Sequence, residues 1–276
     1  MRITDAVIPV GGLGTRLLPA TRSQPKEMLP VVDRPVVQYV VEELAAAGVE
    51  RVLFVTGRRK RAIEDHFDAD PELGTEALAH VSILYTRQPR PAGLGDALRH
   101  ARGFADGRGA IVALGDTIIA PPGASLLGRL LEAFEQSGVD AAVAVEQVPA
   151  ELVSRYGIVV ADASGAVADV IEKPAPGATD SRLAVAARYV LGPTVFEALA
   201  ATEPDHTGEV QLADALRLLI AQGGRVVAVP LEPGERRHDI GTVQSYCEAF
   251  LEHAMSDPSL GPALRARAAA LLDGHG

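Results

Sequence analysis

A glycine-rich segment near the N-terminus is followed, twelve residues after its last glycine, by one of the few lysines in the chain. Gly11, Gly12 and Gly14 come directly after a strand-like run, and Lys26 lies in the segment PKE. The 26 lysine and arginine residues include just three lysines, Lys26, Lys60 and Lys173. Glycines let backbone N–H groups approach a phosphate, and a lysine offers a compact ammonium charge. The pattern indicates a phosphate site, although GGLGTR matches neither the dinucleotide fingerprint nor the ATPase loop, and a tight turn is the alternative.

Two aspartates stand where a metal could be held. Asp116 follows the apolar run AIVALG, and Asp239 lies in RRHDIGT after another strand-like segment. A carboxylate beside a buried strand needs a compensating partner. Mg²⁺ commonly takes one or two carboxylates together with substrate phosphates, so a magnesium site is one interpretation and a turn or helix-cap aspartate is the other. Glu172 and Lys173 also end a predicted strand, where adjacent side chains point to opposite faces and need not interact.

Apolar strands alternate with amphipathic helices through the first half. We expect strands over 5–10, 51–57, 81–88, 109–119 and 140–148, and helices over 35–49, 61–67, 94–104 and 125–138. This alternation predicts an α/β fold with a parallel sheet covered on both faces. Ligands bind beyond the carboxyl ends of such strands. The range Gly11 to Arg16 and the residues Gly57, Gln88 and Asp116 all fall just past these ends.

The second half has a different pattern. A hairpin over 156–174 is expected to turn at 162–165, followed by a strand over 183–191. Helices over 193–202 and 209–224, a strand over 225–234 and final helices from near Thr242 complete the chain. No linker-like stretch separates the halves. We therefore expect a small antiparallel addition to the same sheet and a single domain over 1–276.

Composition excludes several classes of protein. A formal net charge of -10 argues against a nucleic-acid binder. Apolar runs fall short of the roughly 20 residues that span a bilayer, and the first residues lack a secretory layout. The single cysteine, Cys247, excludes an internal disulfide and fits a cytoplasmic protein; we expect it to be buried in a helix. The basic cluster at 58–61 is interpreted as the solvated first turn of a surface helix.

A resemblance rests on segments that occur in a fixed order. They are AVIPVGGLGTRLLPATRSQPKEMLPVVDRPVVQYVVEE, RQPRPAGLGDAL, LGDT, YGIV, EKP, RYVL, GEVQLADAL and HDIGT. Together, over about residues 6–250, they resemble the bacterial UTP–glucose-1-phosphate uridylyltransferases of the sugar-nucleotide pyrophosphorylase family. The resemblance implies a Rossmann-like nucleotidyltransferase fold with a mixed, mostly parallel sheet. It also implies a Mg²⁺-dependent enzyme that forms UDP-glucose and pyrophosphate from UTP and glucose 1-phosphate.

The resemblance assigns roles to individual positions. It implies a nucleotide cradle at Gly11, Gly12, Gly14 and Thr15, pyrophosphate and α-phosphate contacts at Arg16 and Lys26, base contacts at Gln88 and Gly93, sugar contacts at Gly157 and Glu172, a sugar-phosphate contact at Lys173, and metal ligands at Asp116 and Asp239. Residues 1–150 would then mainly bind nucleotide, 151–250 the sugar phosphate, and 251–276 would form C-terminal helices. The family also implies a homo-oligomer, either dimer or tetramer.

The chain departs from the family in one segment. Between residues 67 and 87 it is shorter than the resembled uridylyltransferases, whose insertion there contributes to subunit contacts. The shortening approaches the thymidylyltransferases, so use of dTTP is the nearest alternative. A non-catalytic nucleotide-sugar sensor is an alternative of another class. Such a sensor is expected to lack some of the charged site residues, whereas this chain has all of them: Arg16, Lys26, Asp116, Lys173 and Asp239. A metal-dependent glycosyltransferase is a third alternative. Such an enzyme normally has an Asp-x-Asp metal motif after a strand, and the single aspartate in the segment GDTI argues against it.

Overall fold

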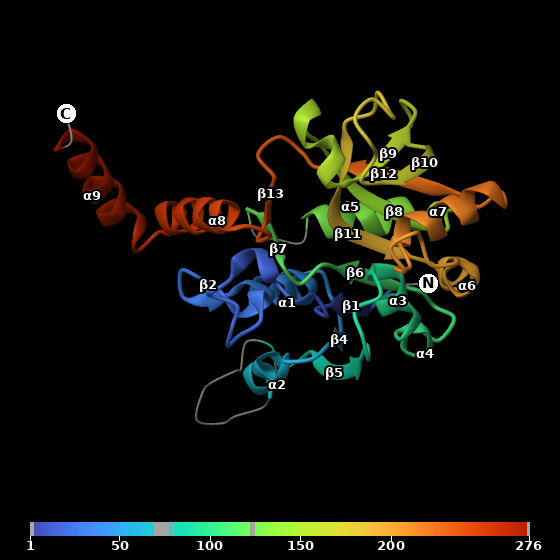
Figure 1. Ribbon diagram of the computed structural model, residues 1–276, viewed down its shortest axis with the longest axis horizontal. Helices are drawn as coiled ribbons and strands as arrows, with labels where there is room; N and C mark the ends of the chain where they lie inside the picture. Colours follow the sequence, from blue (N-terminus) through green and yellow to red (C-terminus); the bar gives the residue numbers. More distant parts are fainter. Residues whose placement is uncertain (1–2, 69–77, 79, 122–124, 275–276) are drawn as a thin grey trace.

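The computed structural model describes residues 3–68, 78, 80–121 and 125–274. Within them, a nine-stranded mixed sheet runs through the molecule in the order β10-β9-β11-β6-β1-β4-β5, with β8 beside β11 and β12 beside β8 (Figure 1). Its strands are β1 Asp5–Pro9, β4 Arg51–Thr56, β5 Ser82–Arg87, β6 Ala110–Ala113, β8 Ala141–Gln147, β9 Gly157–Ala161, β10 Val167–Glu172, β11 Leu183–Leu191 and β12 Val226–Pro230. The predicted α/β class and mixed sheet are confirmed.

The N-terminal half supplies a parallel block in which β1 lies between β4 and β6, and β4 pairs with β5. Helices on both faces bury these strands, and successive side chains enter opposite cores. Val7 packs into one hydrophobic cluster, while Ala6 and Ile8 pack into the other. Burial on both faces explains the near-continuous apolar runs. The helices here are α1 Val36–Ala46, α2 Arg61–Phe67, α3 Leu94–Arg99, α4 Arg102–Ala105 and α5 Ser125–Phe134.

An antiparallel block built on β11 extends the same sheet. β11 pairs antiparallel with β6, β8 and β9, and β9 forms the expected hairpin with β10. Asp162 fixes the hairpin turn, since its carboxylate accepts from the backbone N–H groups of Ser164 (2.8 Å) and Ala166 (3.1 Å). Helices α6 Pro193–Ala201 and α7 Leu212–Ala221 belong to this half. The two halves of the chain therefore share one continuous sheet.

The expected strand over 109–119 is wrong, because the chain turns in its middle. β6 ends at Ala113, and the Thr117 N–H donates to the Leu114 carbonyl (3.3 Å). β7 Thr117–Ala120 then leaves the main sheet and pairs antiparallel with β13 Arg236–Asp239. The turn carries Asp116 out of the sheet and places it beside β13. The expected helix over 94–104 likewise divides into α3 and α4.

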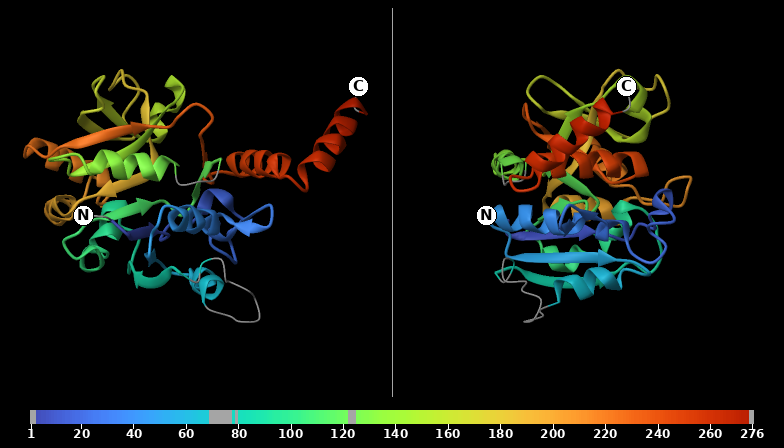
Figure 2. Two further views of the ribbon diagram at one scale, coloured as in Figure 1. Left: turned by 180° about the vertical axis from the view of Figure 1, so that it is seen from behind. Right: turned by 90° about the vertical axis from the view of Figure 1, so that its left-hand side faces the viewer.

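The C-terminal helices extend away from the sheet (Figures 1 and 2). α8 Val243–Ser256 begins at Thr242, whose hydroxyl accepts from the Ser245 N–H (3.1 Å) in a capping box, and α9 is Gly261–Asp273. Ala249 is buried against the body, and Cys247 lies two positions away on the exposed side of α8. The expected burial of Cys247 is therefore wrong. None of the helices in the described ranges is long and apolar enough to cross a bilayer.

A fully buried ion pair ties the antiparallel block to α1. Arg188 on β11 has no exposed surface and donates to both carboxylate oxygens of Glu43 on α1, with its closest contact at 2.6 Å. The same guanidinium donates to the Thr117 carbonyl (3.0 Å), at the start of β7. Breaking a buried pair leaves an uncompensated charge in a medium of low polarity. Arg188 therefore fixes β11, α1 and the segment after Asp116 in one arrangement.

Replacing Glu43 with glutamine should lower the free energy of unfolding by about 3–5 kcal/mol, because Arg188 would stay charged and buried. The matched control is Glu42→Gln on the same helix, where a partly exposed carboxylate pairs with Arg34 at 2.9 Å and should contribute no more than about 1 kcal/mol. Urea unfolding of both variants checks the difference. Equal losses from the two substitutions would contradict the assigned role of the buried pair.

Candidate active site

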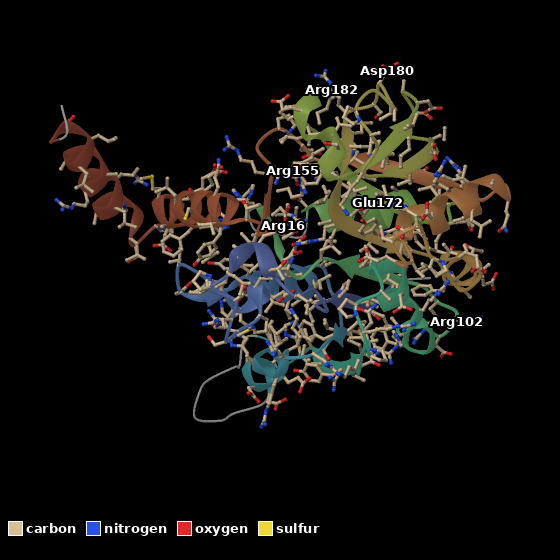
Figure 3. The ribbon with its side chains drawn as sticks, in the orientation of Figure 1. Arg16, Arg102, Arg155, Glu172, Asp180 and Arg182 are labelled. Carbon is tan, nitrogen blue, oxygen red and sulfur yellow. The ribbon has the colours of Figure 1, made fainter. Side chains whose placement is uncertain are left out.

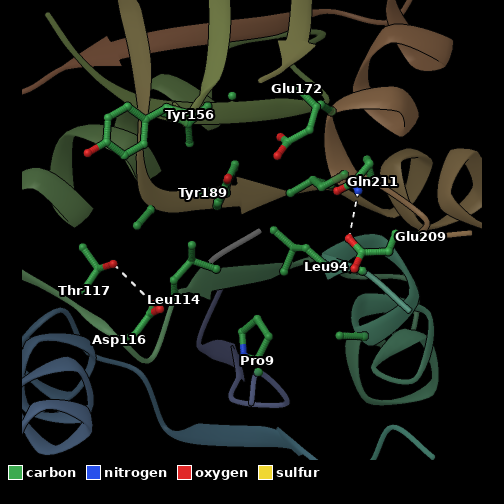
Figure 4. Close-up of a pocket in the computed structure, with 18 of the residues that line it drawn as sticks. Pro9, Leu94, Leu114, Asp116, Thr117, Tyr156, Glu172, Tyr189, Glu209 and Gln211 are labelled. Carbon is green, nitrogen blue, oxygen red and sulfur yellow. Dashed lines mark hydrogen bonds between the residues drawn. The ribbon is translucent and has the colours of Figure 1, made fainter. Parts of the chain in front are cut away.

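A cavity of about 470 Å³ lies between the N-terminal and C-terminal halves. Figure 4 shows Asp116 on its lower side and Glu172 on its upper side. Its lining includes the predicted residues Gly11, Gly12, Lys26, Gln88, Gly93, Asp116, Gly157, Glu172, Lys173 and Asp239. Gly14, Thr15 and Arg16 lie outside the lining. The fold thus brings most of the predicted site to one cavity from segments that are far apart in sequence.

The glycine loop lies directly against other parts of the cavity wall. A Cβ atom on Gly11 would lie 2.9 Å from Oε1 of Gln88, so any other residue there would displace the Gln88 amide. Gly14 has a left-handed backbone with φ of 66° and precedes the short 3-10 helix η1 Thr15–Leu17. Arg16 lies on η1, in the blue N-terminal half, whereas the labelled Glu172 belongs to the yellow-green half (Figure 3). Although Arg16 lies outside the lining, its charge acts on the cavity residue Asp239, whose pKa it lowers.

Lys26 and Asp116 form an ion pair within the cavity. Lys26 begins the 3-10 helix η2 Lys26–Met28. Burial opposes the charged form of each group, but the pairing outweighs it: the pKa of Lys26 is raised by the Asp116 and Glu27 carboxylates, and the pKa of Asp116 is lowered by Lys26. Both groups are therefore charged at neutral pH. The pair presents one ammonium and one carboxylate to a ligand.

Asp239 stands next to Asp116 across the β7–β13 ladder. The Ile240 N–H donates to the Asp116 carbonyl (2.9 Å), and Asp239 is in register with Thr117. Burial, followed by the Asp116 charge, raises the pKa of Asp239, whereas Arg237, Lys26 and Arg16 oppose the rise. The Asp116 charge thus disfavours ionisation of Asp239, and two neighbouring carboxylates are an oxygen-only donor set of the kind that fits Mg²⁺. In the described part of the chain, no third acidic, histidine or cysteine side chain joins them in a cluster.

The upper wall of the cavity comes from the hairpin β9–β10. Glu172 ends β10 opposite Gly157, where a Cβ atom would lie 3.2 Å from Oε2 of Glu172. Lys173 donates to Glu172 at 2.7 Å, so these adjacent side chains do interact. Lys173 has left the strand with φ of 41°, and the strand alternation that separates neighbours no longer applies. An acid and an ammonium thus face Lys26 and Asp116 from the other half.

Gln88 closes the cavity near the loop that precedes α3. Its side chain is buried and donates to the Gly93 carbonyl (3.2 Å) and to Asp96 (2.7 Å). Gly93 has φ of 92°, and a Cβ atom there would lie 2.4 Å from the Val210 carbonyl oxygen. No side chain fits at Gly93 without moving the backbone. The two predicted base-reading positions are therefore held together by a hydrogen bond.

Sequence reasoning missed several charged and polar residues of this region. Arg155, Glu209, Gln211 and Arg237 also line the cavity. Arg237 pairs with Glu146 and stacks over the Tyr156 ring at 4.2 Å, so its place depends on contacts between distant segments. No sequence spacing signals such contacts.

The interpretation of residues 58–61 as a solvated turn is correct for the arginines and wrong for Lys60. Arg58, Arg59 and Arg61 are exposed. Lys60 is buried and forms an ion pair of 2.7 Å with Glu27, which lines the cavity. Its identity as one of three lysines is the signal in the sequence that separates it from its neighbours.

Comparison with known proteins gives consistent relatives. The family described as "Nucleotidyl transferase" matches residues 5–256. The UTP–glucose-1-phosphate uridylyltransferase of Bacillus subtilis (strain 168) is 40% identical over 280 residues, which cover 94% of each chain.

Solved structures agree with these sequence relatives. A UTP-bound UGPase from Acinetobacter baumannii superposes with a TM-score of 0.86 at 34% identity, covering 97% of this chain and 99% of that one. A UDP-glucose pyrophosphorylase complexed with UDP-glucose superposes with a TM-score of 0.83 at 36% identity, covering 91% and 98%. The chain therefore belongs to the nucleotidyl transferase family, in the branch that contains the UTP–glucose-1-phosphate uridylyltransferases.

Proposed function

We propose that this chain transfers the uridylyl group of UTP to glucose 1-phosphate, forming UDP-glucose and releasing pyrophosphate. The observation that carries the proposal is the charged cavity, in which Lys26, Asp116 and Asp239 face Glu172 and Lys173 from the opposite wall. The named uridylyltransferase relatives and the UTP and UDP-glucose complexes of similar structures support it.

We assign the two substrates to opposite walls of the cavity. Residues 1–150 would hold the nucleotide and 151–250 the sugar phosphate, within a single domain over 1–276 whose last residues, 251–276, form C-terminal helices. Gly11, Gly12, Gly14 and Thr15 would cradle the nucleotide, Gln88 and Gly93 would contact the base, and Gly157 and Glu172 would contact the sugar. The shared sheet supports one domain, because it places both walls on a continuous frame.

The chemistry requires two anions to meet. A phosphate oxygen of glucose 1-phosphate attacks the α-phosphorus of UTP in line, a new P–O bond forms, and the bond to pyrophosphate breaks. The attacking phosphate is already ionised, so positioning and charge neutralisation dominate and no general base is needed. Lys26 would meet the α-phosphate, Arg16 the leaving pyrophosphate and Lys173 the sugar phosphate. The planar fork of Arg16 suits two parallel hydrogen bonds to a phosphate.

A divalent cation, which we assign as Mg²⁺, would be held by Asp116 and Asp239. Bound between these two carboxylates, the cation would supply positive charge that neutralises the charge of the phosphates. Lys26 contacts Asp116, so the ammonium that would meet the α-phosphate is paired with one of the two carboxylates that would hold the cation. The pair of aspartates supports this assignment through its oxygen-only donor set.

We further propose a cytoplasmic homo-oligomer, dimer or tetramer, that binds neither nucleic acid nor membranes. Exposed apolar side chains on the protruding helices, including Phe250, Leu251 and Leu264, support self-association. The shortened segment that bears on oligomeric state in the family lies mostly outside the described residues, at 69–77 and 79. The net charge of -10 supports the exclusion of nucleic acid.

The first prediction of this proposal concerns the nucleotide. Purified protein with Mg²⁺ and glucose 1-phosphate should release pyrophosphate fastest with UTP, in comparison with dTTP, ATP, CTP and GTP supplied separately. Preference for dTTP would leave the proposed roles of the charged residues unchanged and would identify the chain as a thymidylyltransferase. Nucleotide binding without pyrophosphate release for any of the five would contradict an enzyme and favour a nucleotide-sugar sensor.

A second prediction concerns the cations. Arg16→Ala and Lys26→Ala should each lower kcat by about 10²–10³, the scale of losing one preorganised electrostatic contact. Arg102→Ala is the matched control, because Arg102 is exposed on α4, far from Arg16 in Figure 3. Steady-state rates with saturating UTP measure the effect. Turnover by Lys26→Ala at the level of the control would rule out its contact with the α-phosphate.

A third prediction concerns the metal. Asp116→Asn and Asp239→Asn should each shift the Mg²⁺ concentration for half-maximal rate upward by tenfold or more, since each removes a charged oxygen ligand and about 1.4 kcal/mol corresponds to tenfold. Asp180→Asn, an exposed aspartate on the far side of the hairpin, serves as control. An unchanged Mg²⁺ titration in Asp116→Asn would refute its role as ligand.

A further inference from the structure

A second buried ion pair lies directly behind the Lys26–Asp116 pair. Lys60, the residue that precedes α2, is 4% exposed, and Glu27 on η2 is 2% exposed. Their charged atoms are 2.7 Å apart. Glu27 lines the cavity, whereas Lys60 lies behind it, outside the lining. The pair thus connects the N-terminus of α2 to the cavity lining, while the Lys60 ammonium stays out of contact with a ligand in the cavity.

The burial of the Lys60–Glu27 pair costs free energy, because both charged groups lose contact with water. Burial lowers the pKa of Lys60 and raises the pKa of Glu27, and the charge of each partner opposes the shift of the other. A well-packed apolar pair would serve stability as well or better at such a position. The chain uses arginine at nearly every other basic position, including both neighbours of Lys60. A compact ammonium fits a buried site next to one carboxylate, where a planar guanidinium is larger and needs more partners.

Two carboxylates compete for the Lys26 ammonium. Asp116 contacts it, and Glu27 is its neighbour in the chain and acts on its pKa as the next largest charge. Glu27 is engaged by Lys60, so Lys26 is directed to Asp116. If Lys60 were neutral, Glu27 would be a buried carboxylate whose nearest cation is Lys26. Lys26 would then satisfy Glu27, and a negative charge would face the incoming phosphates.

We propose that Lys60 is a positioning residue of the transferase, which neutralises Glu27 and thereby keeps Lys26 directed to Asp116 and the nucleotide. This inference rests on the proposed function. Lys60 touches no substrate in this arrangement. Its effect is electrostatic and passes through Glu27, which distinguishes it from a contact that merely stabilises α2.

The test compares Lys60→Met with the double variant Lys60→Met/Glu27→Gln. The single substitution leaves Glu27 uncompensated and should lower kcat about 10–100-fold, the range for residues that orient a functional group, with a smaller change in the KM for glucose 1-phosphate. The double variant removes the competing charge and should return kcat to within about threefold of the wild-type enzyme, since neutral replacement of a buried pair is often tolerated.

The matched control is Arg61→Met, one residue further on, whose side chain is 86% exposed and pairs with Asp65 at 3.3 Å. It should keep wild-type kcat. Thermal unfolding of each variant accompanies the rates, and the double variant, which contains no uncompensated charge, provides the decisive rate if the single variant does not fold. If Lys60→Met folds, a kcat of the double variant as low as that of Lys60→Met would overturn the proposal. If Lys60→Met does not fold, a kcat of the double variant more than tenfold below wild type would overturn it.

Wild-type kcat in Lys60→Met would overturn it as well. Absence of turnover in the unmodified enzyme with UTP and glucose 1-phosphate would instead contradict the proposed function. The two failures are thus separate results of one set of assays.

Discussion

The contact between Lys26 and Asp116 is the interaction around which the site is arranged. It joins a short helix near the N-terminus to a turn that interrupts what would otherwise be a longer central strand. That turn is possible because β7 finds a new partner in β13, a strand from the last third of the chain. The ion pair therefore depends on a strand pairing between distant parts of the chain, which holds Asp116 in reach of the Lys26 ammonium.

Two buried ion pairs support the cavity from behind, and one of their four members, Glu27, also contributes to its lining. Arg188 and Glu43 are buried between β11 and α1 and also fix the carbonyl of Thr117, next to Asp116. Lys60 and Glu27 occupy the corresponding place behind Lys26. Such pairs contribute little to net stability compared with apolar packing, but their directional bonds admit few alternative arrangements. In this protein they are adjacent to Lys26 and to the segment that carries Asp116.

Much of this architecture is visible in the sequence. The burial of β1 and β6 on both faces produces the apolar runs that predict a parallel sheet, and the glycine and aspartate positions follow from the ends of those strands. Local patterns could not reveal the turn at 114–116, because the apolar residues on both sides of GDT are consistent with one continuous strand and its division depends on pairing with β13. The burial of Lys60 was hidden for a related reason: its partner lies 33 residues away, and the arginines beside it are exposed.

The distribution of lysine gives the molecule an unusual chemical signature. All three lysines lie at or directly behind one cavity, and the outer surface takes its positive charge from arginine. Isotopic labelling of lysine alone would therefore yield an NMR spectrum in which every lysine side-chain signal reports on the cavity or its immediate surroundings. Amine-directed reagents would also find little to modify elsewhere apart from the chain's α-amino group. The three lysines thus serve as natural reporters on the cavity and on the buried ion pair behind it.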